Sequence, residues 1–135
     1  MELNARNAAF VLGVIFLIIG VLGYVPNPLV GHTSDGTQAF FATNNTHNLV
    51  HIISGIVLLL GVYTALTPGL ALKIMGIVYA LVAVLGFIMP GEGGMMLGMI
   101  DMGSPPTHDN LLHVVLAIVL LAAGFGIAGT RTAAI

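Results

Sequence analysis

Three histidines and one aspartate stand at matching positions in two segments of the chain, and their spacing suits a metal site. His47 and His51 are four residues apart, so on a helix they share one face. Asp109 and His113 repeat that spacing in the second segment. Three imidazoles and one carboxylate are ligands that Zn, Fe or Mn accept, and imidazole also suits Cu. If the two segments face each other, all four side chains would converge on one ion.

A second interpretation uses only His51 and His113. Each is followed four residues later by a small residue, Gly55 or Ala117. A small residue one turn from an axial histidine leaves room for a planar macrocycle. The two histidines would then hold a b-type haem between them, or each would ligate a chlorophyll-type pigment.

Two asparagines accompany these histidines at the same spacing. Asn48 and Asn110 lie three residues before His51 and His113. Beside a cofactor, they would orient the imidazole rings by hydrogen bonds. The alternative is a structural network, in which Asn and His at a helix start bond to backbone N–H groups and across a bundle. Metal site, macrocycle site and structural network all remain open at this point.

Methionines gather in the segment between residues 90 and 109. Met96, Met99 and Met102 have a spacing that soft Cu(I) could use through thioether sulfur. Methionine also fills irregular gaps in apolar packing. We favour packing at the membrane interface over copper for this segment.

The elements that position these residues are four apolar segments. The chain has 135 residues, of which 58% are hydrophobic and 6% charged, whereas a soluble domain carries about 25% charged residues. A bilayer core needs about 20 apolar residues per helix. Four segments meet that requirement, at about 8–25, 48–66, 70–89 and 110–129. The sequence therefore predicts an all-α fold, a four-transmembrane-helix bundle in a single membrane domain over residues 1–135.

The two halves of the chain resemble each other. The stretch VLGYVP at 21–26 reappears as VLGFIMP at 84–90, and HNLVH at 47–51 reappears as DNLLH at 109–113. We interpret this as a duplication, with one helix–loop–helix repeat at about 8–66 and the other at about 70–129. Because each half has two spans, the halves would insert in parallel, related by an axis near the membrane normal.

The basic residues predict the orientation. Arg6, Lys73 and Arg131 all fall on the same side of the four spans. Basic residues concentrate on the cytoplasmic side of membrane proteins. We therefore expect cytoplasmic N- and C-termini, and both long loops, with the histidines near them, on the outer side.

The remaining composition excludes several classes of function. The middle of the predicted spans carries no Asp, Glu, His or Arg, which argues against a pump, channel or transporter formed by this chain alone. A net charge of −2 with three basic residues gives no nucleic-acid-binding surface. The absence of cysteine excludes disulfides and Cys-ligated clusters. No nucleophile-elbow, phosphate-loop or H-E-x-x-H motif is present, so we expect a non-catalytic protein.

The repeated Asn-x-x-His pattern resembles a bacterial membrane family, domain of unknown function 4383. The segments T-H-N-L-V-H-I-I-S-G at 46–55 and D-N-L-L-H at 109–113 carry the resemblance. It implies a four-helix protein of the bacterial inner membrane and supplies no activity. The Met- and Gly-rich second loop departs from what we expect of the family in general.

Together these features predict an accessory or assembly subunit of a larger membrane complex, of photosynthetic or respiratory type. Such a subunit would contact lipid and other membrane protein subunits, and its outer histidines would ligate a pigment or haem. The alternative is an outer-face metal-binding protein or enzyme that uses the three-His, one-Asp cluster for Zn, Fe, Mn or Cu.

Overall fold

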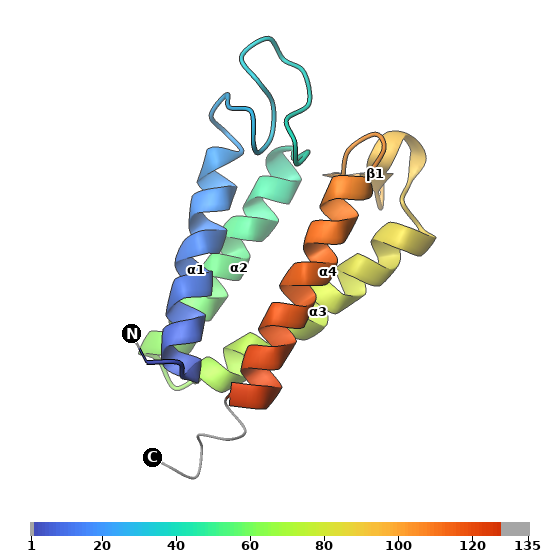
Figure 1. The fold of residues 1–135 in the computed structure, drawn as a ribbon. Helices are drawn as coiled ribbons and strands as arrows, with labels where there is room; N and C mark the ends of the chain where they lie inside the picture. Colours follow the sequence, from blue (N-terminus) through green and yellow to red (C-terminus); the bar gives the residue numbers. More distant parts are fainter. Residues whose placement is uncertain (1, 128–135) are drawn as a thin grey trace.

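The computed structural model describes residues 2–127. Within that range the chain is helical apart from two loops, a short turn and a small hairpin (Figure 1). The long helices are α1 (Ala5–Leu22), α2 (Asn45–Tyr63), α3 (Pro68–Ile88) and α4 (Thr107–Leu121), and α4 continues into a π-helix, η2 (Ala122–Ile127).

All four helices are long and apolar enough to cross a membrane. They contain 18 to 21 residues when η2 is counted with α4. At 1.5 Å per residue, a helix of that length spans about 27–32 Å, close to the thickness of the hydrocarbon core. The predicted all-α fold with four candidate membrane spans is confirmed, and these spans mark a multi-pass membrane protein.

Three of the predicted helix starts were too late by three residues, because polar residues form the first turns. Helix α1 begins after Asn4, whose side chain accepts a hydrogen bond from Asn7 N at 2.8 Å. Helix α2 begins after Asn44, which accepts from His47 N at 3.0 Å. Side-chain caps of this kind satisfy N–H groups that a helix start leaves unpaired. The predicted end of the last helix near 129, and Arg131, lie outside the described residues.

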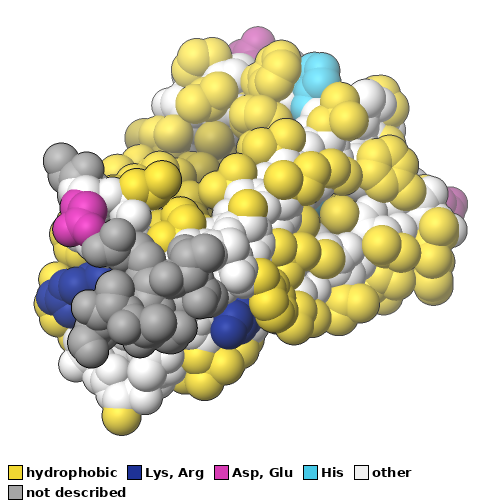
Figure 2. Space-filling view, turned by 60° about the horizontal axis from the view of Figure 1, so that its bottom comes forward, with side chains coloured by type: hydrophobic (Ala, Val, Ile, Leu, Met, Phe, Trp, Pro, Cys, Tyr) yellow, Lys and Arg dark blue, Asp and Glu magenta, His cyan; other side chains and the backbone are white. Residues whose placement is uncertain are grey.

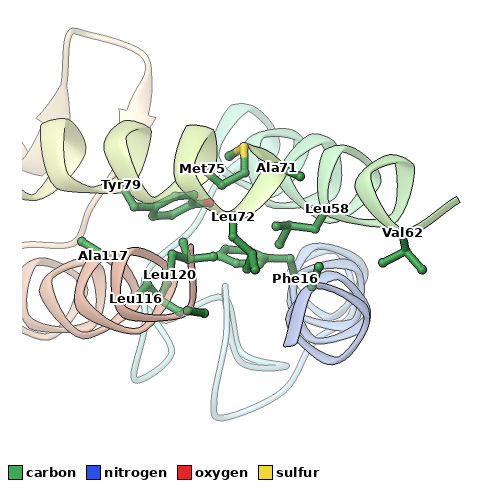
Figure 3. Close-up of a cluster of buried hydrophobic side chains, with 12 residues drawn as sticks. Phe16, Leu58, Val62, Ala71, Leu72, Met75, Tyr79, Leu116, Ala117 and Leu120 are labelled. Atoms are coloured by element: carbon green, nitrogen blue, oxygen red, sulfur yellow. The ribbon is translucent and has the colours of Figure 1, made fainter. Parts of the chain in front are cut away.

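The helices pack as two neighbouring pairs, α1 on α2 and α3 on α4, which diverge toward the loop end (Figure 1). Buried apolar side chains from all four helices meet between the pairs (Figure 3). The largest of them are Phe16, Leu58, Leu72, Tyr79 and Leu120. This apolar core lies below the loop end of the bundle, where the buried histidines His47, His51 and His113 are found.

Close helix approach depends on glycine at two places. A Cβ at Gly55 would lie 2.7 Å from the Gly13 carbonyl oxygen of α1, and a Cβ at Gly76 would lie 2.7 Å from Leu121 Cδ2 of α4. Small residues allow helix backbones to approach in this way in membranes. Both of these glycines therefore pack inside the bundle.

The two long loops lie together at one end of the bundle. The second contains a one-turn helix, η1 (Glu92–Gly94), and a hairpin of β1 (Met95–Met96) and β2 (Ile100–Asp101). The first loop has isolated bridges, Val30 with Phe41 and His32 with Gln38.

The outer surface of the helices is apolar, and the described basic residues lie at the end away from the loops. Ile18, Leu81 and Ile118 are each about 60% exposed, as expected of side chains that face lipid. Arg6 bonds the Val62 carbonyl near the end of α2, and Lys73 lies over the Phe125 ring. Figure 2 shows the Lys and Arg side chains at this end, and hydrophobic side chains over much of the remaining visible face.

Candidate metal centre

Three of the four predicted metal ligands come together at the loop end of the bundle. His47 and His51 of α2 and His113 of α4 each offer a ring nitrogen, and these nitrogens all lie within 4.8 Å of one another. The ring centroids are 4.6 Å apart for His47 and His51 and 5.5 Å apart for His47 and His113. The three residues are 2–3% exposed. Helices α2 and α4 therefore face each other here, as the four-ligand hypothesis required.

The second loop fixes the ring of His47. Its Nδ1 lies 2.6 Å from the Asp101 carbonyl oxygen, so Nδ1 carries the proton and donates. That bond leaves the His47 Nε2 lone pair free to coordinate a metal ion. Two aromatic rings of the core pack against the histidines. The ring centroid of Phe16 is 6.0 Å from that of His51, and the ring centroid of Tyr79 is 5.7 Å from that of His113.

Several nitrogens of the cluster have no protein partner. Among the described residues, His47 Nε2, both ring nitrogens of His51 and His113 Nδ1 are buried without a hydrogen bond. Thr43 Oγ1, which lines the same cavity, is also unpaired. Buried polar groups are normally satisfied, and an unsatisfied one costs about 1–3 kcal/mol. The cluster therefore offers several unpaired ring nitrogens that a metal ion or another ligand could satisfy.

Asp109, the fourth predicted ligand, is buried beside the cluster and engaged elsewhere. Its Oδ1 accepts a hydrogen bond from Ala42 N at 2.9 Å, and its Oδ2 is 3.8 Å from His47 Nδ1. Asp109 is not among the groups whose ligand atoms lie within 4.8 Å of one another. It anchors the first loop to α4, and the close set consists of three imidazoles.

The two asparagines face glycines on the neighbouring helix of their own pair. A Cβ on Gly23 would overlap Asn48 Oδ1, and a Cβ on Gly86 would overlap Asn110 Oδ1. Asn110 Nδ2 donates to the Gly86 carbonyl at 3.0 Å. The contacts of Asn48 with Gly23 and of Asn110 with Gly86 thus lie within each helix pair, and neither asparagine is hydrogen-bonded to His51.

The small residues predicted to border a macrocycle are used for packing. Gly55 packs against Gly13 and Leu17 of α1, and Ala117 belongs to the apolar core. The cavity beside the imidazoles has a volume of about 100 Å³ and is lined by Thr43, His47, His51, Asp109 and His113 with five apolar residues. That volume is below the roughly 300–1,000 Å³ of cavities that hold larger organic ligands.

A family model covers most of the chain. The model of the family described as Domain of unknown function (DUF4383) matches residues 6–126. The chain belongs to this family. The match includes the three histidines and both Gly–Asn pairs. No curated protein and no solved structure gives a match to the chain.

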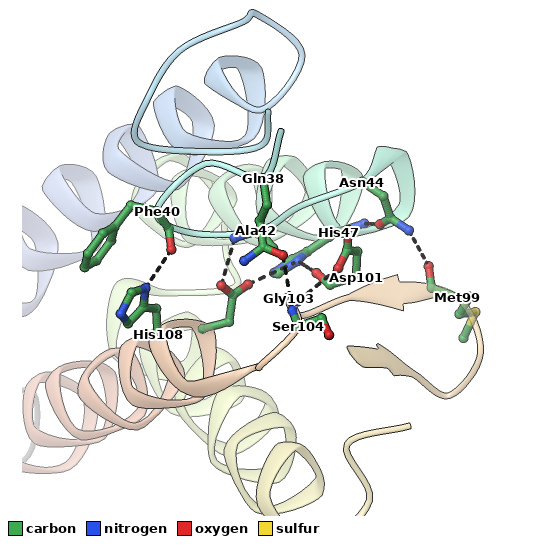
Figure 4. Close-up of polar contacts among 11 residues, drawn as sticks. Gln38, Phe40, Ala42, Asn44, His47, Met99, Asp101, Gly103, Ser104 and His108 are labelled. Carbon is green, nitrogen blue, oxygen red and sulfur yellow. Dashed lines mark hydrogen bonds and ion pairs between the residues drawn. The ribbon is translucent and has the colours of Figure 1, made fainter. Parts of the chain in front are cut away.

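In this member of the family, the two loops are bonded to each other above the histidines (Figure 4). Asn44 Nδ2 donates to the Met99 carbonyl at 3.0 Å, and Ser104 N donates to Gln38 Oε1 at 3.1 Å. His108 stacks on Phe40 with centroids 4.0 Å apart. His108 is exposed and His32 lies in the first loop, and neither belongs to the close group of imidazoles.

Some functional groups were missed from sequence. The Asp101 carbonyl that orients His47 is a backbone atom and has no sequence signal. Thr43 gave no spacing pattern that distinguishes it from other loop residues. The sequence favours packing at the membrane interface for Met96 and Met102, and the structure places both in the lining of a cavity that the three imidazoles also line.

Proposed function

We propose that the chain is a metal-binding membrane protein whose ion is held by His47, His51 and His113. The observation that carries the proposal is the convergence of three buried imidazoles with unpaired nitrogens. Around a tetrahedral ion with bonds of about 2.0–2.1 Å, ligand nitrogens are about 3.3 Å apart. Small rotations of the rings would close the present spacing to that value. Imidazole suits Zn, Cu and Fe.

The same geometry favours a single ion over a haem or a pigment. A macrocycle would need space next to Gly55 and Ala117, and other helices occupy that space. The burial of the histidines also supports holding an ion over catalysis on a substrate, since a catalytic metal keeps an open coordination position.

The membrane orientation that we propose places the site on the outer side. Arg6 and Lys73 lie at the end opposite the histidines, and basic residues concentrate on the cytoplasmic side. We propose cytoplasmic termini and, from the family, a bacterial inner membrane.

A role as a subunit of a larger complex is a secondary part of this proposal. Apolar side chains exposed on every helix would face lipid or other membrane subunits. Gly13, Gly55 and Gly76 are used inside the bundle, so they do not form a separate face for a partner helix. The metal site therefore leads the proposal.

An internal duplication accounts for the arrangement of the site. Each half supplies one helix pair with a Gly–Asn contact, Gly23 with Asn48 and Gly86 with Asn110. We propose that the two halves arose as repeats and that their facing helices created the site between them.

Metal analysis of the detergent-solubilised chain tests the proposal. We expect about one equivalent of a transition metal in the unmodified protein and little in His51→Ala or His113→Ala. His108→Ala is the matched control, because His108 is exposed outside the cluster, and it should retain the metal. A metal-free protein after loading with Zn, Fe, Mn and Cu would overturn the proposal. A Soret band that disappears in His51→Ala would point to a macrocycle instead.

A further inference from the structure

The second loop places two methionines against the histidine cluster. Met96 and Met102 are each 1% exposed, whereas Met99 between them is 50% exposed. Both buried methionines line a cavity of about 20 Å³ that His47, His51 and His113 also line. A space of that size accommodates about one water-sized particle.

The hairpin that carries these methionines is held firmly over the site. Met96 pairs with Ile100 across the two strands, and Met102 N donates to the Gly94 carbonyl at 2.9 Å. The Asp101 carbonyl, next to Met102, accepts from His47 Nδ1. The hairpin therefore fixes two thioethers and one imidazole relative to one another.

The ligand set around this space is uncharged. Two carboxylates lie near the cluster but outside the close group: Asp109 accepts a bond from the first loop, and Asp101 accepts a bond from Gly103 N. The cost of moving an ion into an apolar surrounding rises with the square of its charge. A monovalent ion therefore costs about a quarter as much as a divalent ion of the same size to bury among neutral ligands. Thioether sulfur and imidazole nitrogen also suit a soft cation.

We infer that the ion at this site is Cu(I), with Met96 and Met102 supplying thioether ligands next to the three imidazoles. The inference rests on the proposed function, because it names the ion for the same histidine site. It differs from the packing role expected of the methionines from sequence, in which leucine would serve as well as methionine.

Cu(I) binding by the purified full chain, measured against a chromogenic Cu(I) chelator without oxygen, tests the inference. We expect Met96→Leu with Met102→Leu to weaken Cu(I) binding by about 10- to 100-fold, the loss typical when partners of a metal site are removed. Zn(II) binding should change little, because zinc would use the imidazoles alone. Met99→Leu, in the same hairpin but exposed, is the control and should bind Cu(I) like the unmodified chain.

The outcomes separate this inference from the proposed function. Sulfur scattering at the copper absorption edge of the unmodified chain, lost in the double variant, would support thioether ligation. Equal Cu(I) affinity in the unmodified chain and the double variant would overturn the copper inference and leave the histidine site standing. An unmodified chain that binds neither Cu(I) nor any divalent metal would overturn both. A melting temperature for each variant confirms that loss of binding does not reflect unfolding.

Discussion

In the first half of the chain, α1 packs on α2 and Gly23 faces the Asn48 amide; in the second, α3 packs on α4 and Gly86 faces the Asn110 amide. Above these matching contacts, the halves differ. The first loop is organised by Asn27, whose side chain bonds three carbonyls and two backbone N–H groups. The second is organised by a hairpin that presents methionine to the histidines.

The two halves contribute different side chains to the histidine cluster and its surroundings. His47 and Asp109 occupy matching sequence positions, yet His47 offers a free nitrogen to the cluster and Asp109 accepts a bond from the first loop. The helix contact is shared by the halves, whereas the groups at the site depend on which loop lies above each helix.

The largest predicted effect compares one glycine from each loop. Gly94 and Gly36 both have positive φ, but a Cβ on Gly94 would overlap the Gly103 carbonyl and a Cβ on Gly36 meets nothing within 4 Å. We expect Gly94→Ala to lower the free energy of unfolding by about 3–5 kcal/mol. Gly36→Ala should cost about 1–2 kcal/mol. Unfolding in mixed micelles measures both; equal losses would show that the hairpin is no more constrained than the first loop.

The matching positions His47 and Asp109 give the next effect. Asp109→Ala leaves the buried Ala42 N–H without its partner, which should cost about 1–3 kcal/mol of stability. It should leave the metal content unchanged, whereas His47→Ala should remove the metal. Asp109→Asn, which keeps an acceptor oxygen, is the control for stability. If Asp109→Asn lost the metal while keeping its stability, the Asp109 carboxylate would have to be one of the metal ligands.

A smaller effect tests whether the Gly–Asn contact is the same in both halves. Gly86→Ala should be destabilising beside Asn110 and better tolerated beside Asn110→Ala, because the Cβ would overlap the amide. We expect a coupling energy of about 1–2 kcal/mol from this double-mutant cycle. The cycle on Gly23 and Asn48 should give a similar value. A coupling near zero in one half alone would mean that the two contacts are not equivalent.

The smallest effect lies at the exposed tip of the first loop. Hydrogen bonds from the Thr33 and Thr37 hydroxyls lower the pKa of Asp35 to about 2. A depressed carboxyl pKa stabilises the fold above its unfolded value, 3.8, and that contribution is lost as the pH falls through about 2. The Thr37 amide signal in NMR should therefore shift as the pH falls through about 2, with little change above pH 4. Asp35→Asn should abolish the shift, and an unchanged titration in that variant would assign it to another group.

The number of helices could be predicted because apolar length gives the spans. The four-residue spacing of His47 and His51 gives their shared face on one helix, but the approach of α2 to α4, which brings His113 to them, is a tertiary contact that the sequence left open. The ligand set also depends on tertiary contacts. Asp109 lies outside the close set of imidazoles, and one of its oxygens accepts a hydrogen bond from the N–H of Ala42, which is far away in sequence. The burial of Met96 and Met102 depends on hairpin register, which methionine spacing does not specify.

The burial of the three imidazoles has a consequence for exchange kinetics. The histidines are 2–3% exposed, and the two loops above them bond to each other, so an ion held there as proposed would leave after the loops separate. Its release would then follow the rate of that opening, and excess chelator would remove it at a rate independent of chelator concentration. The residence time of the proposed ion would depend on contacts between the loops, such as Asn44 with Met99, separately from the strength of the metal–ligand bonds.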